Sequence, residues 1–123
     1  MKVIEVRKAI QSLLKTVHPR VFFEVADKKK IYPYLVCDLP NSIDDGTMEN
    51  FVLEVDGWDQ PDNGDTTELE TLMGTIDEVL HSAVIRPPGM ALIIYRDNRL
   101  SLRDDDERLR RRKYRYQVRT FGG

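Results

Sequence analysis

The feature that most constrains the fold is an amphipathic helix pattern in the middle of the chain, with strand patterns on both sides of it. Between positions 69 and 83 apolar residues recur at steps of three and four, as on one face of a helix. These residues are Leu69, Leu72, Met73, Ile76, Val79, Leu80 and Ala83. Asp65-Thr66-Thr67-Glu68 has the pattern of a capping box in front of this helix, and Arg86-Pro87-Pro88-Gly89 is a stop signal behind it.

Strand patterns lie before and after this central helix. The segments 21–25, 34–39 and 51–58 precede it, and 90–96 and about 110–121 follow it. A first helical face, from Val3 to Val17, opens the chain and ends at His18-Pro19. Strands grouped on either side of one helix favour an α+β fold, which we expect to be a mostly antiparallel four- to five-stranded sheet with two helices packed on one face. The other face of the sheet is expected to be polar and to bear charges from Glu54, Asp56, Arg115 and Arg119.

The length predicts one domain, residues 1–123, because single cores typically occupy about 100 to 150 residues. Turn-forming residues predict exposed loops near 40–50, 59–65 and 97–108. The first strands, 21–25 and 34–39, are expected to be joined by a turn that holds Lys28, Lys29 and Lys30. No apolar stretch approaches the ~18 residues of a membrane span, and the first residues contain no apolar signal core. We therefore expect a protein that is made in a cytoplasm and has no membrane partner.

Residues that could carry chemistry are few. Asp56, Asp59, Asp62 and Asp65 recur at every third position, but a calcium loop needs ligands at alternate positions, and we interpret them as turn formers and a helix cap. His18 and His81 have no second ligand at metal spacing, and the lone Cys37 is interpreted as a buried strand residue. We expect no catalytic residue, no cofactor and no metal.

The charge is divided by position. Residues 1–85 hold 8 Lys and Arg against 16 Asp and Glu, whereas residues 86–123 hold 11 against 5. A chain with one acidic and one basic pole can bind copies of itself head to tail, or set its basic pole against a polyanion.

The strongest local signal is the basic run near the C-terminus. Its members are Arg108, Arg110, Arg111, Arg112, Lys113, Arg115 and Arg119. Three interpretations are open: a solvated edge strand protected by charge, a nucleic-acid contact that also uses Tyr114 and Tyr116, or an interface with acidic residues of another copy or protein. The sequence pI near 5.7 lies far from the basic footprint of a dedicated nucleic-acid binder.

The acidic half supplies the opposite partners. The candidates are Asp44, Asp45, Asp56, Asp59 and Asp62, with Trp58 as an interface anchor. Our hypothesis is that Arg110 to Lys113 face Asp44-Asp45 or the 56–65 segment of an adjacent subunit. The two poles would then meet across a subunit boundary and not within one chain.

Three segments carry a resemblance to a known family. They are YPYLVCDL (32–39), NFVLEVDGWDQPDNGDTTELETLMGTIDEVLH (50–81) and RLRRRKYRYQVRTF (108–121). In element order and in these segments the chain resembles the tail terminator or tail completion proteins of long-tailed bacteriophages and prophages.

The resemblance implies a structural virion protein with no substrate, assembled in the bacterial host cytoplasm and located in the tail or neck. Such a protein forms a ring, commonly of six subunits, that caps the tail tube and ends its polymerisation. The tail-tube protein would bind one face of the ring and a head-completion or neck protein the other, and DNA would pass through the lumen without specific binding. Two alternatives remain: a head-completion or neck connector ring, and a small nucleic-acid-binding α+β module.

Overall fold

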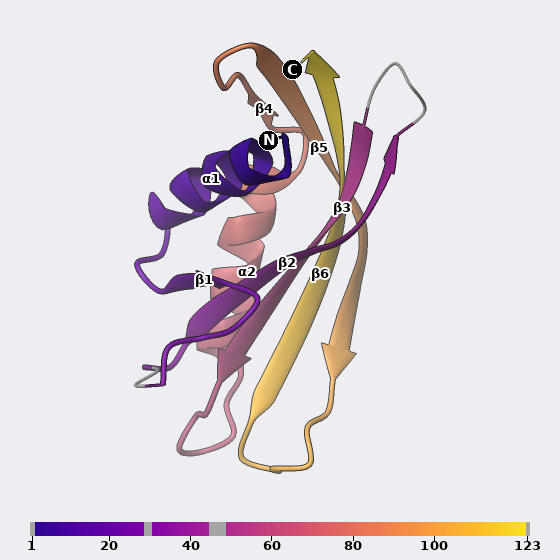
Figure 1. The fold of residues 1–123 in the computed structure, drawn as a ribbon. Coiled ribbons are helices and arrows are strands. Elements are labelled where there is room, and N and C mark those ends of the chain that lie inside the picture. Colours follow the sequence, from indigo (N-terminus) through magenta and orange to yellow (C-terminus); the bar gives the residue numbers. More distant parts are fainter. Residues whose placement is uncertain (1, 29–30, 45–48, 123) are drawn as a thin grey trace.

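Two helices lie against one face of a curled six-stranded sheet in the computed structural model, which describes residues 2–28, 31–44 and 49–122 (Figure 1). The elements are α1 (Lys2–Lys15), β1 (Val21–Phe23), β2 (Tyr34–Asp44), β3 (Glu49–Asp59), α2 (Thr67–Leu80), β4 (Val84–Ile85), β5 (Met90–Leu102) and β6 (Arg110–Gly122). The strand order is β1-β2-β3-β6-β5-β4, and every neighbouring pair except β1 and β2 is antiparallel. The predicted fold class is confirmed, and the sheet has more strands than expected because β4 spans only two residues and shows no periodic pattern.

The core lies between the helices and the inner face of the sheet. Helix α1 buries Val6, Ile10 and Leu14. Helix α2 buries Leu69, Met73, Ile76 and Leu80, the residues that its sequence period had placed on one face. The inner face of the sheet contributes Leu35, Cys37, Leu53, Val55, Leu92, Ile94, Tyr116 and Val118, all fully buried. The predicted burial of Cys37 is confirmed.

One glycine lets α2 lie close to the sheet. A Cβ atom at Gly57, on β3, would lie 2.5 Å from Sδ of Met73 and 3.1 Å from a Cδ atom of Leu69. Any other residue at position 57 would therefore force the side chain of Met73, or the helix that carries it, to shift.

The ends of α2 differ from the sequence prediction. The N-cap residue is Thr66, which makes no side-chain capping bond, and Oδ1 of Asp65 instead accepts hydrogen bonds from the amide nitrogen and Oγ1 of Thr67 at 2.9 and 2.6 Å. The predicted capping box is therefore wrong by one position, because Asp65 stands before the cap and not in it. At the other end the helix stops before Ala83, since Ser82 has φ of 66° and the main chain of 82–83 bonds to Ile94 of β5.

Two of the three predicted loops are partly strand. Strand β2 continues to Asp44 through an irregularity between Asp38 and Asn41, which accommodates Pro40, and β3 starts at Glu49. Strand β5 runs through the first half of the predicted 97–108 loop and ends at Leu102, with a similar irregularity between Arg96 and Asn98. Turn-forming residues mark bulges here and not chain reversals. The predicted loop near 59–65 is present, as residues 60–66.

The first two strands do not form a hairpin. Strand β1 ends at Phe23, where the next residue, Glu24, has φ of 68°, and β1 runs parallel to β2. The expected hairpin turn is therefore wrong, because β1 and β2 are parallel; of its residues, Lys29 and Lys30 lie outside the described part of the chain. A parallel pair requires a crossover because the chain must return to the starting end of the first strand.

Candidate subunit interface

The side of the sheet that faces away from the helices carries a ladder of opposite charges between β3 and β6. Register places Glu54 opposite Arg115 and Asp56 opposite Lys113. The alternation of strand side chains puts these residues on the outer face, because their neighbours Leu53, Val55 and Tyr116 fill the inner one. The two central strands of the sheet therefore present their charges to each other and to the outside.

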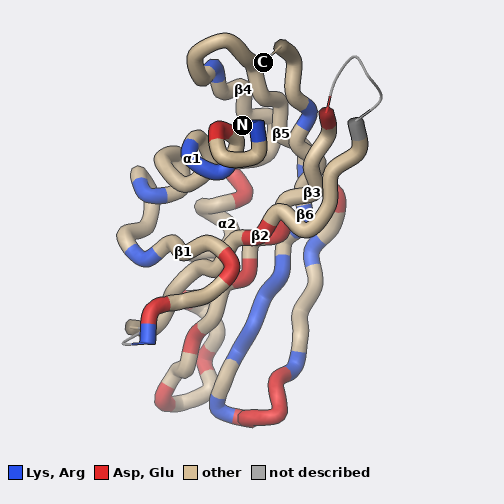
Figure 2. The backbone as a smooth tube through the Cα atoms, viewed as in Figure 1, with Lys and Arg blue, Asp and Glu red and all other residues tan. Residues whose placement is uncertain are grey.

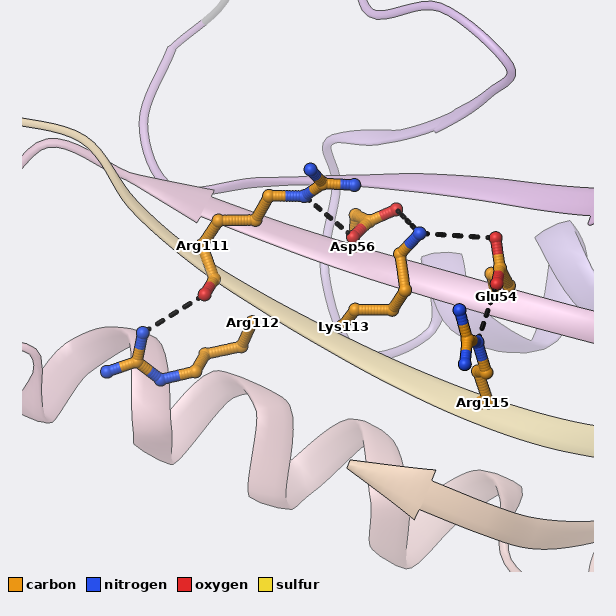
Figure 3. A network of polar contacts seen from close by, with 6 residues as sticks. All are labelled: Glu54, Asp56, Arg111, Arg112, Lys113 and Arg115. Carbon is orange, nitrogen blue, oxygen red and sulfur yellow. Dashed lines mark hydrogen bonds and ion pairs between the residues drawn. The ribbon is translucent and has the colours of Figure 1, made fainter. Parts of the chain in front are cut away.

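The ladder is a connected network (Figure 3). Nε of Arg111 donates to Oδ1 of Asp56 at 3.0 Å, and Nζ of Lys113 lies 3.3 Å from Oε1 of Glu54 and 3.8 Å from Oδ2 of Asp56. Nε of Arg115 donates to Oε2 of Glu54 at 2.7 Å. Three cations thus share two carboxylates, and the network keeps a net positive charge of one.

The network is partly shielded from water. Lys113 and Glu54 each expose 15% of their side chains, and Asp56 exposes 12%. Burial alone would raise the pKa of Glu54, but hydrogen bonds from Arg115 and Lys113 outweigh it and hold that pKa below its usual value. Removing one partner would leave a partly shielded charge without its counter-charge, which costs more than the loss of an exposed ion pair.

Aromatic rings continue the outer face beyond the charges. The guanidinium of Arg111 lies 4.8 Å from the ring centroid of Trp58. Tyr34, on the next strand, stacks on Trp58 with centroids 6.4 Å apart and an interplanar angle of 11°, and Phe22 meets Tyr34 edge to face. Arg111 therefore joins the charged ladder to an aromatic cluster that includes the predicted anchor Trp58.

The other predicted basic residues are spread over both faces and the adjoining loop. Arg112 points to the helix side and pairs with Glu70 of α2. Arg108 pairs with Asp106 through two nitrogens, at 3.1 and 2.8 Å. Arg119 lies over the ring of Tyr95, 6.0 Å from its centroid. Arg110 bonds to the carbonyl of Leu109 at 3.2 Å. The basic run therefore does not form a single surface, because its strand residues point to both faces of the sheet and Arg108 lies in the loop before β6.

The predicted acidic residues are also dispersed. Asp59 is buried, and its Oδ1 accepts the amide of Gln60 at 2.8 Å. Asp62 lies in the exposed loop that follows β3. Asp44 is the last residue of β2, and Asp45 lies outside the described residues.

The expectation that the two charged poles meet only across a subunit boundary is wrong for Asp56. Arg111 and Lys113 of the same chain pair with it, because β3 and β6 are neighbours in the sheet although 55 residues separate Arg111 from Asp56. Sequence reasoning assigned the charges to the correct faces of both strands, but it could not say which strands were adjacent.

Charge that the ladder does not neutralise gathers at one end of the sheet. Figure 2 shows acidic positions along the loop after β3 and along the loop between β5 and β6, with basic positions following β6 between them. The start of β6 lies beside the loop after β3, since a side-chain nitrogen of Arg110 lies 3.5 Å from the position of a Cβ at Gly64. Asp62 and Asp104–Glu107 belong to these loops.

Comparison with solved structures shows what fold this is. The chain aligns with a chain of the virion of a native gene transfer agent particle over 98% of its own length and 97% of that chain, with a TM-score of 0.75 and 10% identity. This protein therefore shares its fold with that chain of the particle. A second solved chain aligns over 95% of this protein and 91% of that chain, with a TM-score of 0.70 and 13% identity. No protein-family model and no curated protein matches the sequence.

The described residues offer neither a metal site nor a membrane-spanning helix. They contain no group of three or more His, Cys, Asp and Glu side chains arranged to hold a metal ion. Neither helix in the described ranges is long and apolar enough to cross a membrane.

Sequence reasoning missed two features of this surface. Tyr34, Tyr32 and Phe22 join Trp58, although they come from segments that were interpreted only as strand and turn. The alternation of Tyr32, Tyr34 and Val36 was a usable signal for a second apolar face. The open margins of β2 and β5 were also missed, because their outer halves were assigned to loops.

Proposed function

We propose that this protein is a structural component of a phage-like virion that assembles as a ring, caps the tail tube and provides the surface for head joining. The observation that carries the proposal is the end-to-end likeness of its fold to a chain of the gene transfer agent virion. The resemblance of segments 32–39, 50–81 and 108–121 to tail terminators supports the more specific role.

The outer sheet face supports association rather than binding of a polyanion. Glu54 and Asp56 neutralise much of the basic strand, so Arg111, Lys113 and Arg115 are not free to release counterions from a nucleic acid. The same face offers Trp58 with stacked neighbours, and aromatic rings beside paired charges are typical of protein interfaces.

The test is the mass of the purified protein in solution together with images of the particles, first alone and then with tail tubes of the phage or prophage that encodes it. We expect closed rings of one subunit number, bound at tube ends, and tubes that stop growing when the protein is added. A protein that stays monomeric at every concentration and beside tail tubes would refute the proposal. Rings that bind heads and ignore tubes would indicate a neck protein.

A further inference from the structure

Strand β5 is paired on both sides for only part of its length. Strand β4 pairs with Leu92 and Ile93, the main chain of 82–83 bonds to Ile94, and Nδ1 of His81 accepts the amide of Arg96 at 3.0 Å. From Asp97 to Leu102 no described residue bonds to the backbone on the side away from β6. This half of β5 is an open sheet margin.

Strand β2 has the corresponding gap on the opposite margin. Strand β1 pairs only with Leu35 to Cys37, and the amide of Glu24 bonds to the carbonyl of Cys37 at 2.8 Å. Beyond this point β2 bonds only to β3 within the described part of the chain. Pro40 has no N–H group and therefore limits the open ladder to residues 41–44.

We propose that copies of this chain join edge to edge, with β5 of one copy pairing antiparallel with the open half of β2 of the next. The direction follows from the sheet itself. Strands β2, β3, β6 and β5 alternate in direction, so β2 and β5 of one chain run opposite ways. A neighbour in the same orientation therefore brings its β5 antiparallel to β2 without any inversion. The inference rests on the proposed ring, whose subunit contacts it names.

The side chains select one register. Ile43 exposes 65% of its surface. It pairs with Asn50, which in turn pairs with Arg119 of β6, and Leu100 pairs with Lys113 of β6. Because Arg119 and Lys113 both lie on the outer face, Ile43 and Leu100 lie on that face too. Directly opposed residues of two paired strands must lie on the same face. Pairing Ile43 with Leu100 satisfies this rule, places two apolar residues together, and sets position 44, an aspartate, opposite Arg99.

The neighbouring registers are poorer. A shift by one residue would oppose residues of different faces, which the pleat does not allow. A shift by two toward Asn98 would set position 44 opposite Asp97, and like charges in that arrangement repel. A shift by two the other way, toward Leu102, leaves Arg99 without an acidic partner. The register 43 with 100 is the one that joins apolar to apolar and acid to base.

Edge pairing of this kind is heterologous. Each copy uses β2 toward one neighbour and β5 toward the other, so every addition leaves one open margin of each kind until the assembly closes. Three features limit pairing of these edges with other strands. They are Pro40, the charge of Arg99 and the irregularity in each strand, which together set the limits of the two open segments. The part of β2 that remains available for pairing with another copy is about four residues long, and its partner on β5 is defined.

A disulfide tests the register directly. In the variant Ile43→Cys with Leu100→Cys, opposed residues of paired strands lie about 4.5 to 5.5 Å apart, within the range of a disulfide. The link cannot form inside one chain, because β3 and β6 separate the two strands by three spacings of about 4.8 Å. The matched control, Ile43→Cys with Ser101→Cys, moves one cysteine by one residue to the other face. Cys37 is fully buried and stays in both variants.

Mild oxidation, non-reducing gel electrophoresis and particle imaging give the readout, with and without tail tubes. We expect inter-chain disulfides in the 43/100 variant at a yield at least ten times that of the 43/101 variant, and rings. Rings without this difference would overturn the edge pairing and leave the ring function standing. A selective link in open chains that never close would uphold the edge pairing and overturn the ring. Neither link nor assembly would overturn both.

Discussion

At the scale of single residues, Glu54 shows how the outer face depends on one carboxylate. It accepts from Arg115 at 2.7 Å and from Lys113 at 3.3 Å, and its side chain is 15% exposed. Without it two cations would lie side by side with Asp56 as the remaining acidic partner. In the sequence Glu54 is one of several acidic residues on this strand, but in the structure it lies at the centre of the network.

We predict that Glu54→Gln lowers the free energy of unfolding by about 1 to 3 kcal/mol at neutral pH, because the amide removes the negative charge shared by Arg115 and Lys113 and keeps only one acceptor oxygen. The pKa of Glu54 is lower in the folded chain, so its stabilisation is full above the usual value near 4.5 and declines as the pH falls toward the folded value. Urea unfolding at pH 7 and at pH 3.5 measures both effects. The difference between wild type and variant should shrink at the lower pH, and a constant difference would contradict the assignment.

The control is Glu78→Gln, which changes an exposed carboxylate on α2 that makes no bond or ion pair with another described residue. Its effect on stability should stay within about 0.5 kcal/mol at both pH values, as for surface substitutions in general.

Glycine at position 57 is a second residue-scale determinant. We predict that Gly57→Ala destabilises the chain by about 1 to 3 kcal/mol, because its Cβ would lie 2.5 Å from Sδ of Met73. Gly74→Ala is the matched opposite case: nothing lies within 4 Å of its Cβ, and alanine in a helix should add about 0.5 to 1 kcal/mol. Thermal unfolding of the two variants checks the opposite signs. If both substitutions changed the unfolding temperature equally, α2 would be able to move away from β3 without a loss of stability.

At the scale of elements, a buried polar contact fixes α2 on the sheet. The hydroxyl of Tyr116, from β6, donates to Oδ1 of Asp77 at 2.8 Å, and Nη1 of Arg96, from β5, donates to Oδ2 at 2.6 Å. Burial, followed by the hydrogen bond to Asp77, raises the pKa of Tyr116, so the hydroxyl keeps its proton over the working pH range. Helix α2 is thus tied to two strands through one carboxylate.

We predict that Tyr116→Phe lowers the free energy of unfolding by about 1 to 2 kcal/mol, since Asp77 loses one donor while the ring still fills its place in the core. Tyr114→Phe, two residues earlier on the same face, is the control, because its hydroxyl makes no hydrogen bond within the described residues. Denaturant unfolding compares the two, and a larger loss for Tyr114→Phe would show that the Asp77 contact does not hold the helix.

At the scale of the whole molecule, internal pairing changes what the charge split means. The acidic and basic halves of the sequence meet first within one sheet, on β3 and β6. The charge left for partners is carried by the loops at the end of the sheet (Figure 2). Residues on the open margin of β5, such as Arg99, carry more of it. Association therefore depends on shape and strand edges more than on the sum of opposite charges.

We predict that the isolated protein does not bind duplex DNA at 0.15 M salt, because its basic strand is neutralised by its own carboxylates. Anisotropy of a labelled duplex, titrated at several salt concentrations, measures this. The double variant Glu54→Gln with Asp56→Asn, checked for folding by circular dichroism, is the matched control and should gain salt-dependent binding. Salt-dependent binding by the unmodified chain would instead favour a nucleic-acid-binding module.

The sequence by itself determined the periodic parts of this protein. The apolar steps from Leu69 to Leu80 predicted α2 and the residues that it buries, and the alternation about Glu54 and Arg115 predicted which side chains face outward. These features follow from local geometry, because helix and strand periods repeat within a few residues and need no knowledge of distant neighbours.

Only the tertiary structure decided which strands are adjacent and which margins stay open. The pairing of Asp56 with Arg111, the parallel partner of β1 and the two-residue β4 depend on contacts between segments far apart in the chain. Bulges at 38–41 and 96–98 let strands continue through residues that locally favour turns, since the ladder hydrogen bonds on either side outweigh a local preference. The open edges of β2 and β5 arise in the same way, from strands longer than the neighbours that cover them.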